Sequence, residues 1–204
     1  PGLASTLCRL AEIAWVQGRF DDAERLVREG AAFARGAGSR TELAYALLSL
    51  GEVLEKVAKF DEAHSALERS LVLYNELRHR NYLTQVHDDL GSIDMHQGRY
   101  GEARDHLEAG LALAREYGPQ FCIGNSLAWL GCLELAHGAP AKAHSLLRES
   151  IAVYEETGPQ DNLGWALACM AIADHTVGAS GQARQHLLRA LQISHDMKSM
   201  HLPL

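Results

Sequence analysis

The sequence predicts an all-α fold, a right-handed α-solenoid of five tandem helix-turn-helix repeats. Three observations support this prediction. A six-residue segment recurs every 40 residues without insertion or deletion. Each 40-residue period carries two apolar stripes with helical spacing. No segment shows the alternating pattern of a strong strand candidate. The recurring segments are GRFDDA (18–23), AKFDEA (58–63), GRYGEA (98–103), GAPAKA (138–143) and GASGQA (178–183).

Each repeat is predicted to form two antiparallel helices, A and B. In the second repeat, Asp61 follows a break at 57–59 and is placed to cap helix B. Between repeats, Gly118-Pro119 and Gly158-Pro159 are typical of one helix ending and the next beginning, and Pro140 suits a first helical turn. The stripe of helix A in the second repeat is Leu43, Leu47, Leu50 and Leu54, and that of helix B is Ala63, Leu67, Leu71 and Tyr74.

Small and large residues recur at fixed positions, which predicts how the helices pack. At each small position we expect a neighbouring backbone or large side chain to come close. The small positions are Ala11, Gly51, Gly91, Gly131 and Ala171 in helix A, and Ala23, Ala63, Ala103, Ala143 and Ala183 in helix B. The large positions are Leu10, Leu50, Leu90, Leu130 and Met170 in helix A, and Val27, Leu67, Leu107, Leu147 and Leu187 in helix B.

Length and composition favour one domain over residues 1–204, with repeats at about 1–40, 41–80, 81–120, 121–160 and 161–204. Because the chain opens with Pro-Gly, we expect it to be part of a longer protein. A net charge of −7 argues against direct nucleic-acid binding and favours basic partners. The four cysteines lack metal-site spacing, and no membrane span or leader is evident. We therefore expect reduced thiols and a cytoplasmic protein without membrane contact.

The order of large and small residues resembles that of the tetratricopeptide repeat family. The matching positions in the second repeat are Leu47, Leu50, Gly51, Leu54, Ala63, Leu67 and Ser70. The period is 40 residues rather than the family's usual 34, which suggests extra residues between helix B and the next helix A. Longer periods of this kind are similar to those of kinesin light chains, Leu-Gly-Asn-type adaptors and the sensor regions of bacterial ATPase-type transcription regulators.

The resemblance implies that helix A lines a concave ligand-binding groove. One half of this groove is then acidic and the other half is apolar and aromatic. A peptide or protein segment with basic and apolar residues would complement both halves. The expected groove residues are Glu12, Tyr45, Glu52, Gln85, Asp88, Asp89, Asn125, Trp129 and Trp165.

Other interpretations of these residues stay open at the sequence level. The acids also suit a solvated helix surface, Trp129 and Trp165 also suit packing between adjacent A helices, and Asn125 also suits a helix start with water as its partner. His87 replaces a leucine found in the other repeats, which indicates a partly buried histidine or a tuned polar site.

The other histidines suggest little chemistry. Asp88, Ser92 and His96 share a helix face, but they lack the ligand set of a zinc site, so no metal is expected. His64 with His144, and His106 with His186, recur in two positions of helix B that alternate with Arg or Leu in other repeats, which suggests surface variation.

The sequence predicts a protein that is not an enzyme and needs no cofactor, because it lacks nucleophile, metal-hydrolase and phosphate-loop motifs. The leading hypothesis is a non-catalytic scaffold that binds a protein segment in its groove. A first alternative is the ligand-sensing domain of a multidomain bacterial transcription regulator. A second is a dimerisation module that uses apolar residues exposed at the solenoid end, namely Leu187, Leu191, Met197 and Met200.

Overall fold

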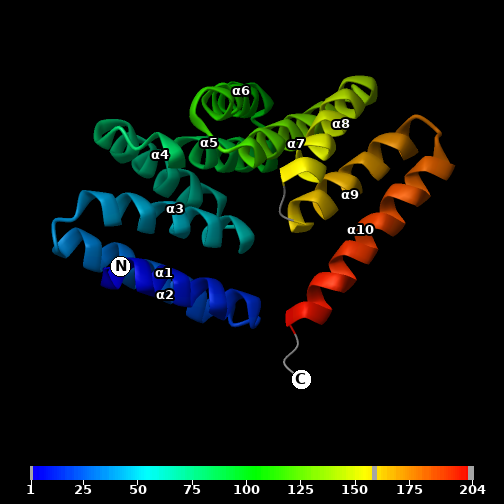
Figure 1. Cartoon of the computed structure of the whole chain (residues 1–204). Coiled ribbons are helices and arrows are strands. Elements are labelled where there is room, and N and C mark those ends of the chain that lie inside the picture. Colours follow the sequence, from blue (N-terminus) through cyan, green and yellow to red (C-terminus); the bar gives the residue numbers. More distant parts are fainter. Residues whose placement is uncertain (1, 158–159, 202–204) are drawn as a thin grey trace. The chain divides into compact units, whose positions relative to one another are not determined.

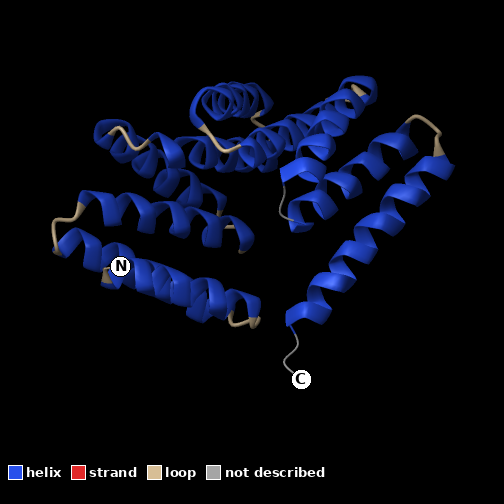
Figure 2. Cartoon of the chain, in the orientation of Figure 1, coloured by secondary structure: helices blue, strands red, loops and turns tan. Residues whose placement is uncertain are grey.

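A computed structural model describes residues 2–157 and 160–201, and within them it contains ten α-helices and no strand (Figures 1 and 2). The predicted all-α class and the five helix pairs are therefore confirmed. Gly158 and Pro159 lie outside the described residues. The helices are α1 (Leu3–Val16), α2 (Phe20–Gly36), α3 (Arg40–Lys56), α4 (Phe60–Leu77), α5 (Arg80–His96), α6 (Tyr100–Tyr117), α7 (Gln120–Ala136), α8 (Pro140–Thr157), α9 (Gln160–Thr176) and α10 (Ser180–His201).

The helices fill almost the whole repeat. In the second repeat, α3 has 17 residues and α4 has 18. Only Arg78 and His79 separate α4 from α5, so the expectation of extra residues between helix B and the next helix A was wrong. The residues beyond the usual period lengthen both helices, because each added turn extends the apolar stripe that a helix can bury.

The turn between the helices of one repeat has the same hydrogen bonds each time. After α1, the Gly18 amide donates to the Trp15 carbonyl at 2.8 Å and the Arg19 amide donates to the Ala14 carbonyl at 2.9 Å. Gly18 has φ +74°, as glycine readily allows, whereas Ala58 holds the equivalent place with φ +59°. Asp61 is not the cap of α4, as we had expected, because Lys59 precedes the helix and Asp61 lies in its first turn.

The structure divides into two compact units, Pro1–His106 and Leu107–Leu204, here called unit 1 and unit 2. In unit 1, α1 packs on α2 and α3 packs on α4, and the A helices α1, α3 and α5 also contact one another in sequence. In unit 2, α7 packs on α8, α9 packs on α10, and α7 contacts α9. Figure 1 shows the antiparallel course of α9 and α10. The A helices of successive repeats thus form one continuous face within each unit.

The predicted pairing of small with large residues is confirmed in the inner repeats. A Cβ atom added to Gly51 would lie 2.5 Å from Leu67 Cγ, and one added to Gly131 would lie 2.7 Å from Leu147 Cγ. Leu10 and Leu187 occupy large positions yet are 45% and 48% exposed. They lie in α1 and α10, the first and last described helices, and no described repeat packs on the outer side of either.

None of the described helices combines the length and the apolar character required to cross a bilayer.

Candidate functional site

The A-helix face of each unit is built from pairs of residues about one period apart, drawn from successive A helices. Most partners are 37 residues apart rather than 40, as for Ser92 with Glu55 and Cys132 with Cys169. The three-residue difference is close to one helical turn, which is the stagger between neighbouring A helices. We call Tyr45–Tyr82, Glu52–Asp89 and Glu55–Ser92 the unit 1 ladder, and Asn125–Asn162, Trp129–Trp165 and Cys132–Cys169 the unit 2 ladder.

Carboxylates dominate the unit 1 ladder. Ser92 Oγ donates to Glu55 Oε1 at 2.5 Å, and Gln85 Nε2 donates to Glu52 Oε1. His96 Nε2 lies 3.9 Å from Glu55 Oε1. These partners hold the two glutamates on the face that α3 and α5 share.

The pKa values of these acids are shifted upward. Burial is the main cause for Glu52 and Glu55, whose pKa values lie above the ordinary range. Burial together with the negative charges of Glu52, Glu55 and Asp88 raises the pKa of Asp89 well above its usual value, and Lys56 opposes this shift. Burial is thus the main reason that these three acids hold their protons to a higher pH than ordinary carboxyl groups do.

Aromatic residues flank these acids in unit 1. The Tyr45 and Tyr82 rings lie edge to face with centroids 6.1 Å apart, and Tyr82 stacks on Tyr74 at 5.0 Å. Lys56 Nζ lies 5.2 Å from the Trp15 ring centroid, within cation–π range. Tyr82 was not identified as a site residue from the sequence. Its position 37 residues after Tyr45 indicates the contact only once the stagger between A helices is known.

The unit 2 ladder is neutral. Asn125 Oδ1 accepts from Asn162 Nδ2 at 2.8 Å and from the Tyr154 hydroxyl. The rings of Trp129 and Trp165 are tilted by 54° with centroids 4.6 Å apart, and both side chains are half-buried. Each tryptophan therefore packs between A helices and still offers part of its surface.

The structure brings the predicted groove residues together in two groups, one in each unit. Glu12, Tyr45, Glu52 and Asp89 interact electrostatically in unit 1. Asp88 is only 4% exposed, so its carboxylate is mostly withdrawn from solvent. Gln85 and Glu12 are exposed, and the half-buried members are Tyr45, Glu52, Asp89, Asn125, Trp129 and Trp165.

The interpretation of the helix B histidines as surface variation was wrong. Asp94, fully buried in α5, lies 3.4 Å from His64 Nε2 and 3.9 Å from His106 Nε2, and it also pairs with Arg99. The sequence did carry a signal for this cluster, because Asp94 occupies a position that holds the apolar residues Ala14 and Leu54 in the earlier repeats.

The same arrangement recurs in unit 2. Asp174, 1% exposed, lies 3.3 Å from His144 Nε2 and 2.6 Å from His186 Nδ1. Both clusters therefore hold a buried carboxylate between two histidines of successive B helices. Even so, no group of three or more His, Cys, Asp or Glu in the described part of the chain is arranged to hold a metal ion.

His87 lies beside the cluster around Asp94. Its Nδ1 lies 3.1 Å from His106 Nδ1, and its side chain is half-buried. Burial, with a smaller contribution from the charge of His106, lowers the pKa of His87 to about 4. The structure thus favours the partly buried histidine over a tuned polar site.

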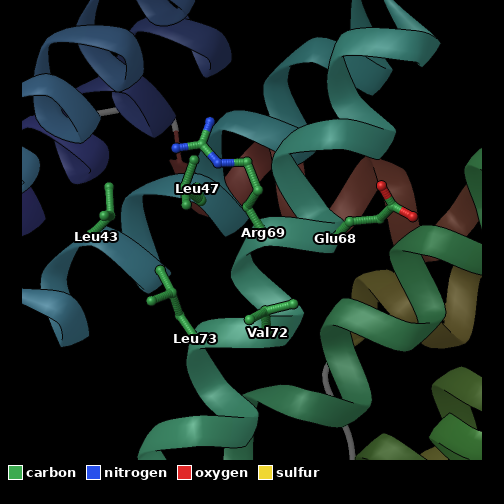
Figure 3. A pocket seen from close by; sticks show the side chains of 6 residues that line it. All are labelled: Leu43, Leu47, Glu68, Arg69, Val72 and Leu73. Atoms are coloured by element: carbon green, nitrogen blue, oxygen red, sulfur yellow. The ribbon is translucent and has the colours of Figure 1, made fainter.

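A pocket of about 530 Å³ lies between α3 and α4, and none of the residues that line it is a predicted groove residue (Figure 3). Four apolar side chains form most of its wall, and Arg69 and Glu68 extend from α4 to different sides of it. A second pocket of about 360 Å³ shares Arg69. The first pocket is lined by Leu43, Leu47, Glu68, Arg69, Val72 and Leu73.

Several solved structures resemble this fold. A putative kinesin light chain with TPR-like repeats from Podosopora anserina is 18% identical, with 96% of each chain covered and a TM-score of 0.70. BtubC (BKLC) from P. vanneervenii is 17% identical, with 98% of this chain and 83% of the other covered and a TM-score of 0.74. A Rap protein complexed with Competence and Sporulation Factor is 15% identical, with 92% and 53% covered and a TM-score of 0.84.

At these identities the likeness concerns the fold alone. No curated protein matches the chain in sequence. The family model for the tetratricopeptide repeat, in contrast, matches residues 2–76 and 82–156, which are most of the sequence. The chain is therefore a member of the tetratricopeptide repeat family.

Proposed function

We propose that this protein is a non-catalytic scaffold that binds a segment of another protein along the A-helix faces of its repeats. Tetratricopeptide repeats generally mediate protein–protein interaction, and the Rap protein of similar fold is seen in complex with Competence and Sporulation Factor. The observation that carries the proposal is the contrast between the ladders. Equivalent positions hold Glu52 and Asp89 in unit 1 but Cys132 and Cys169 in unit 2.

The unit 1 ladder suits a basic part of the ligand. Burial raises the pKa of Glu52, Glu55 and Asp89, and repulsion from neighbouring carboxylates adds to the shifts of Glu52 and Asp89. A Lys or Arg side chain placed among them would stabilise the ionised forms. Binding of a basic segment would therefore release protons near the pH at which these acids titrate.

The unit 2 ladder suits an apolar or aromatic part of the ligand. Trp129 and Trp165 offer ring surface on this face, and Ile172 is 56% exposed on α9. Because Asn125 Oδ1 already accepts two hydrogen bonds, its Nδ2 is the atom that would donate to a ligand carbonyl. Aromatic anchors of this kind often carry much of the binding energy.

The experiment is selection of peptides from a display library against the whole chain, followed by titration of the selected peptide. We expect Trp165→Ala to weaken binding by about 30-fold, and Glu52→Lys/Asp89→Lys to abolish selection of basic residues. Phe33→Ala and Asp21→Lys, at exposed positions of α2, are the matched controls and should bind normally. If all four variants bind as the wild type does, recognition lies elsewhere, and the pocket beside Arg69 becomes the next candidate.

Salt dependence separates the scaffold from the alternative of a small-molecule sensor domain. Attraction between a basic peptide and the unit 1 acids is screened within about 10 Å at 0.1 M salt, so affinity should fall as salt rises. A neutral sugar or metabolite held by the Trp129–Trp165 surface would bind almost independently of salt. Binding of such a compound, with no peptide selected, would favour the sensor.

Self-association is a second candidate, and one observation favours it. Leu187, Leu188 and Leu191 on α10 are 48%, 55% and 58% exposed, and they would be covered by a second copy of the chain. Met197 and Met200, expected on the same surface, lie outside the residues whose side chains are described. A mass by light scattering that stays monomeric at high concentration would exclude it, and Leu188→Lys should abolish any dimer.

A further inference from the structure

The two cysteines of the unit 2 ladder form a close thiol pair. Cys132 on α7 donates a hydrogen bond to the sulfur of Cys169 on α9, with 3.1 Å between the two Sγ atoms. Both are free thiols, Cys132 half-buried and Cys169 6% exposed. A disulfide bond has an S–S length of roughly 2.05 Å, so about 1 Å of approach separates this contact from a bond.

The position of the pair within the fold gives such a bond a structural consequence. The helices α7 and α9 belong to different repeats and contact each other directly. Trp129 lies three residues before Cys132 on α7, and Trp165 lies four residues before Cys169 on α9, so the ring pair and the thiol pair are adjacent rungs of one ladder. A covalent link at the thiols would fix the stagger of the two helices beside the tryptophans.

We propose that Cys132 and Cys169 are an oxidation site at which a hydroperoxide converts the two thiols into a reversible disulfide that joins α7 to α9. This inference stands independently of the proposed scaffold function, because it concerns chemistry within unit 2 alone.

The reaction proceeds in two balanced steps. In the first, the Cys169 thiolate attacks one oxygen of the hydroperoxide, the O–O bond breaks, the leaving alkoxide takes up a proton to become an alcohol (water, for hydrogen peroxide), and Cys169 becomes a sulfenic acid. In the second, Cys132 attacks the Cys169 sulfur, the S–S bond forms, the S–O bond breaks, and the hydroxide leaves as water with the Cys132 proton. Overall, two thiols are oxidised by two electrons and one hydroperoxide is reduced to an alcohol and water.

The hydrogen bond assigns the first step to Cys169. Donation from Cys132 lowers the pKa of Cys169, whereas that same bond and burial raise the pKa of Cys132 far above its ordinary value. The thiolate is the nucleophile towards peroxides, so Cys169 reacts first and Cys132 resolves the intermediate. Cys8, whose pKa burial raises to about 11, is expected to stay a thiol.

The test uses the whole chain treated with hydrogen peroxide under native conditions. We expect two of the four thiols to disappear, a peptide map to contain Cys132 linked to Cys169 within one chain, and dithiothreitol to restore all four. The melting temperature should rise by roughly 5 °C or more on oxidation. A Cys8→Ala/Cys122→Ala variant, which keeps the pair, is the matched control and should behave as the wild type.

Two single variants separate the roles of the sulfurs. Cys132→Ser should accumulate a sulfenic acid at Cys169 that dimedone traps, and Cys169→Ser should give several-fold less dimedone adduct. Four intact thiols after treatment of the folded chain, a link to Cys8 or Cys122, or a link between two chains would overturn the proposal. Direct peptide mapping of the wild type keeps the test decisive even where a variant folds poorly.

Discussion

His87 shows how one residue can make the stability of a fold depend on pH. Because its folded pKa of about 4 lies below the ordinary value of 6.5, the folded state favours neutral His87. Its contribution to stability is therefore complete above about pH 6.5 and is lost as the pH falls towards 4. The neighbouring His106, whose pKa burial also lowers, acts in the same direction, while Asp94 opposes that shift.

We expect His87→Leu, which restores the residue of the other repeats, to raise the free energy of unfolding by on the order of 1–2 kcal/mol at about pH 5. The gain should shrink towards neutral pH. Urea unfolding followed by circular dichroism at about pH 5 and at neutral pH measures the gain and its change with pH. His195→Leu, the same substitution at an exposed position of α10, is the matched control for the change of residue type. An equal gain at both pH values would show that only packing has changed.

The buried acid Asp174 depends on its histidine partners. Removing one partner leaves a charge with less compensation in a site that is 1% exposed, so His186→Leu should cost about 2 kcal/mol. In the double variant Asp174→Leu/His186→Leu the carboxylate is gone, and much of the loss should be recovered. Urea unfolding of His186→Leu, of Asp174→Leu and of the double variant gives the coupling energy between the two residues. Additive losses would mean that the pair makes no specific contribution.

At the scale of one helix pair, a missing side chain sets the distance between helices. A Cβ on Gly131 would meet Leu147 Cγ at 2.7 Å, whereas a Cβ on Gly101 would meet nothing within 4 Å. We expect Gly131→Ala to lower stability by about 1–3 kcal/mol through overpacking, and Gly101→Ala to raise it by about 0.5–1 kcal/mol. Thermal melts of both variants test this, and a neutral Gly131→Ala would show that α7 and α8 separate at little cost.

The turn between α3 and α4 is strained at one alanine. Ala58 has φ +59° where the equivalent residues of the other repeats are glycines. A left-handed conformation costs a non-glycine residue about 1–2 kcal/mol, so Ala58→Gly should raise the free energy of unfolding by about 1 kcal/mol. Ala37→Gly, at φ −76°, is the control and should bring no gain. Equal effects of the two substitutions in chemical denaturation would contradict this explanation.

For the whole molecule, the contacts join helices that are close in sequence. Within unit 2, α9 buries Leu163, Leu167 and Met170, and it packs on both α8 and α10. Stability should therefore be nearly a sum over repeats and their interfaces. A chain that is truncated after Thr157 should keep its helix content per residue. A chain that is truncated after Thr176 should be less soluble, because it keeps α9 but lacks α10, the helix that covers α9. Circular dichroism and sedimentation compare the two truncated chains. If the chain truncated after Thr157 were unfolded, stability would not be a sum over repeats.

Much of this architecture was predictable because it repeats. Gly51 opposite Leu67 and Gly131 opposite Leu147 follow from residue size at a fixed period. Asp61 was misassigned because the sequence does not show where a helix begins to within a residue or two. The histidine–aspartate clusters were missed because their members come from three helices, and no single repeat contains all of them.

The sequence by itself determined the helices, their phase and most of the apolar residues that form the core, because these depend on spacing within one repeat. Only the tertiary structure decided which side chains meet across repeats, such as Cys132 with Cys169 and Trp129 with Trp165. The physical reason is the stagger between neighbouring A helices, which packing sets and which shifts each contact by about one turn from the sequence period.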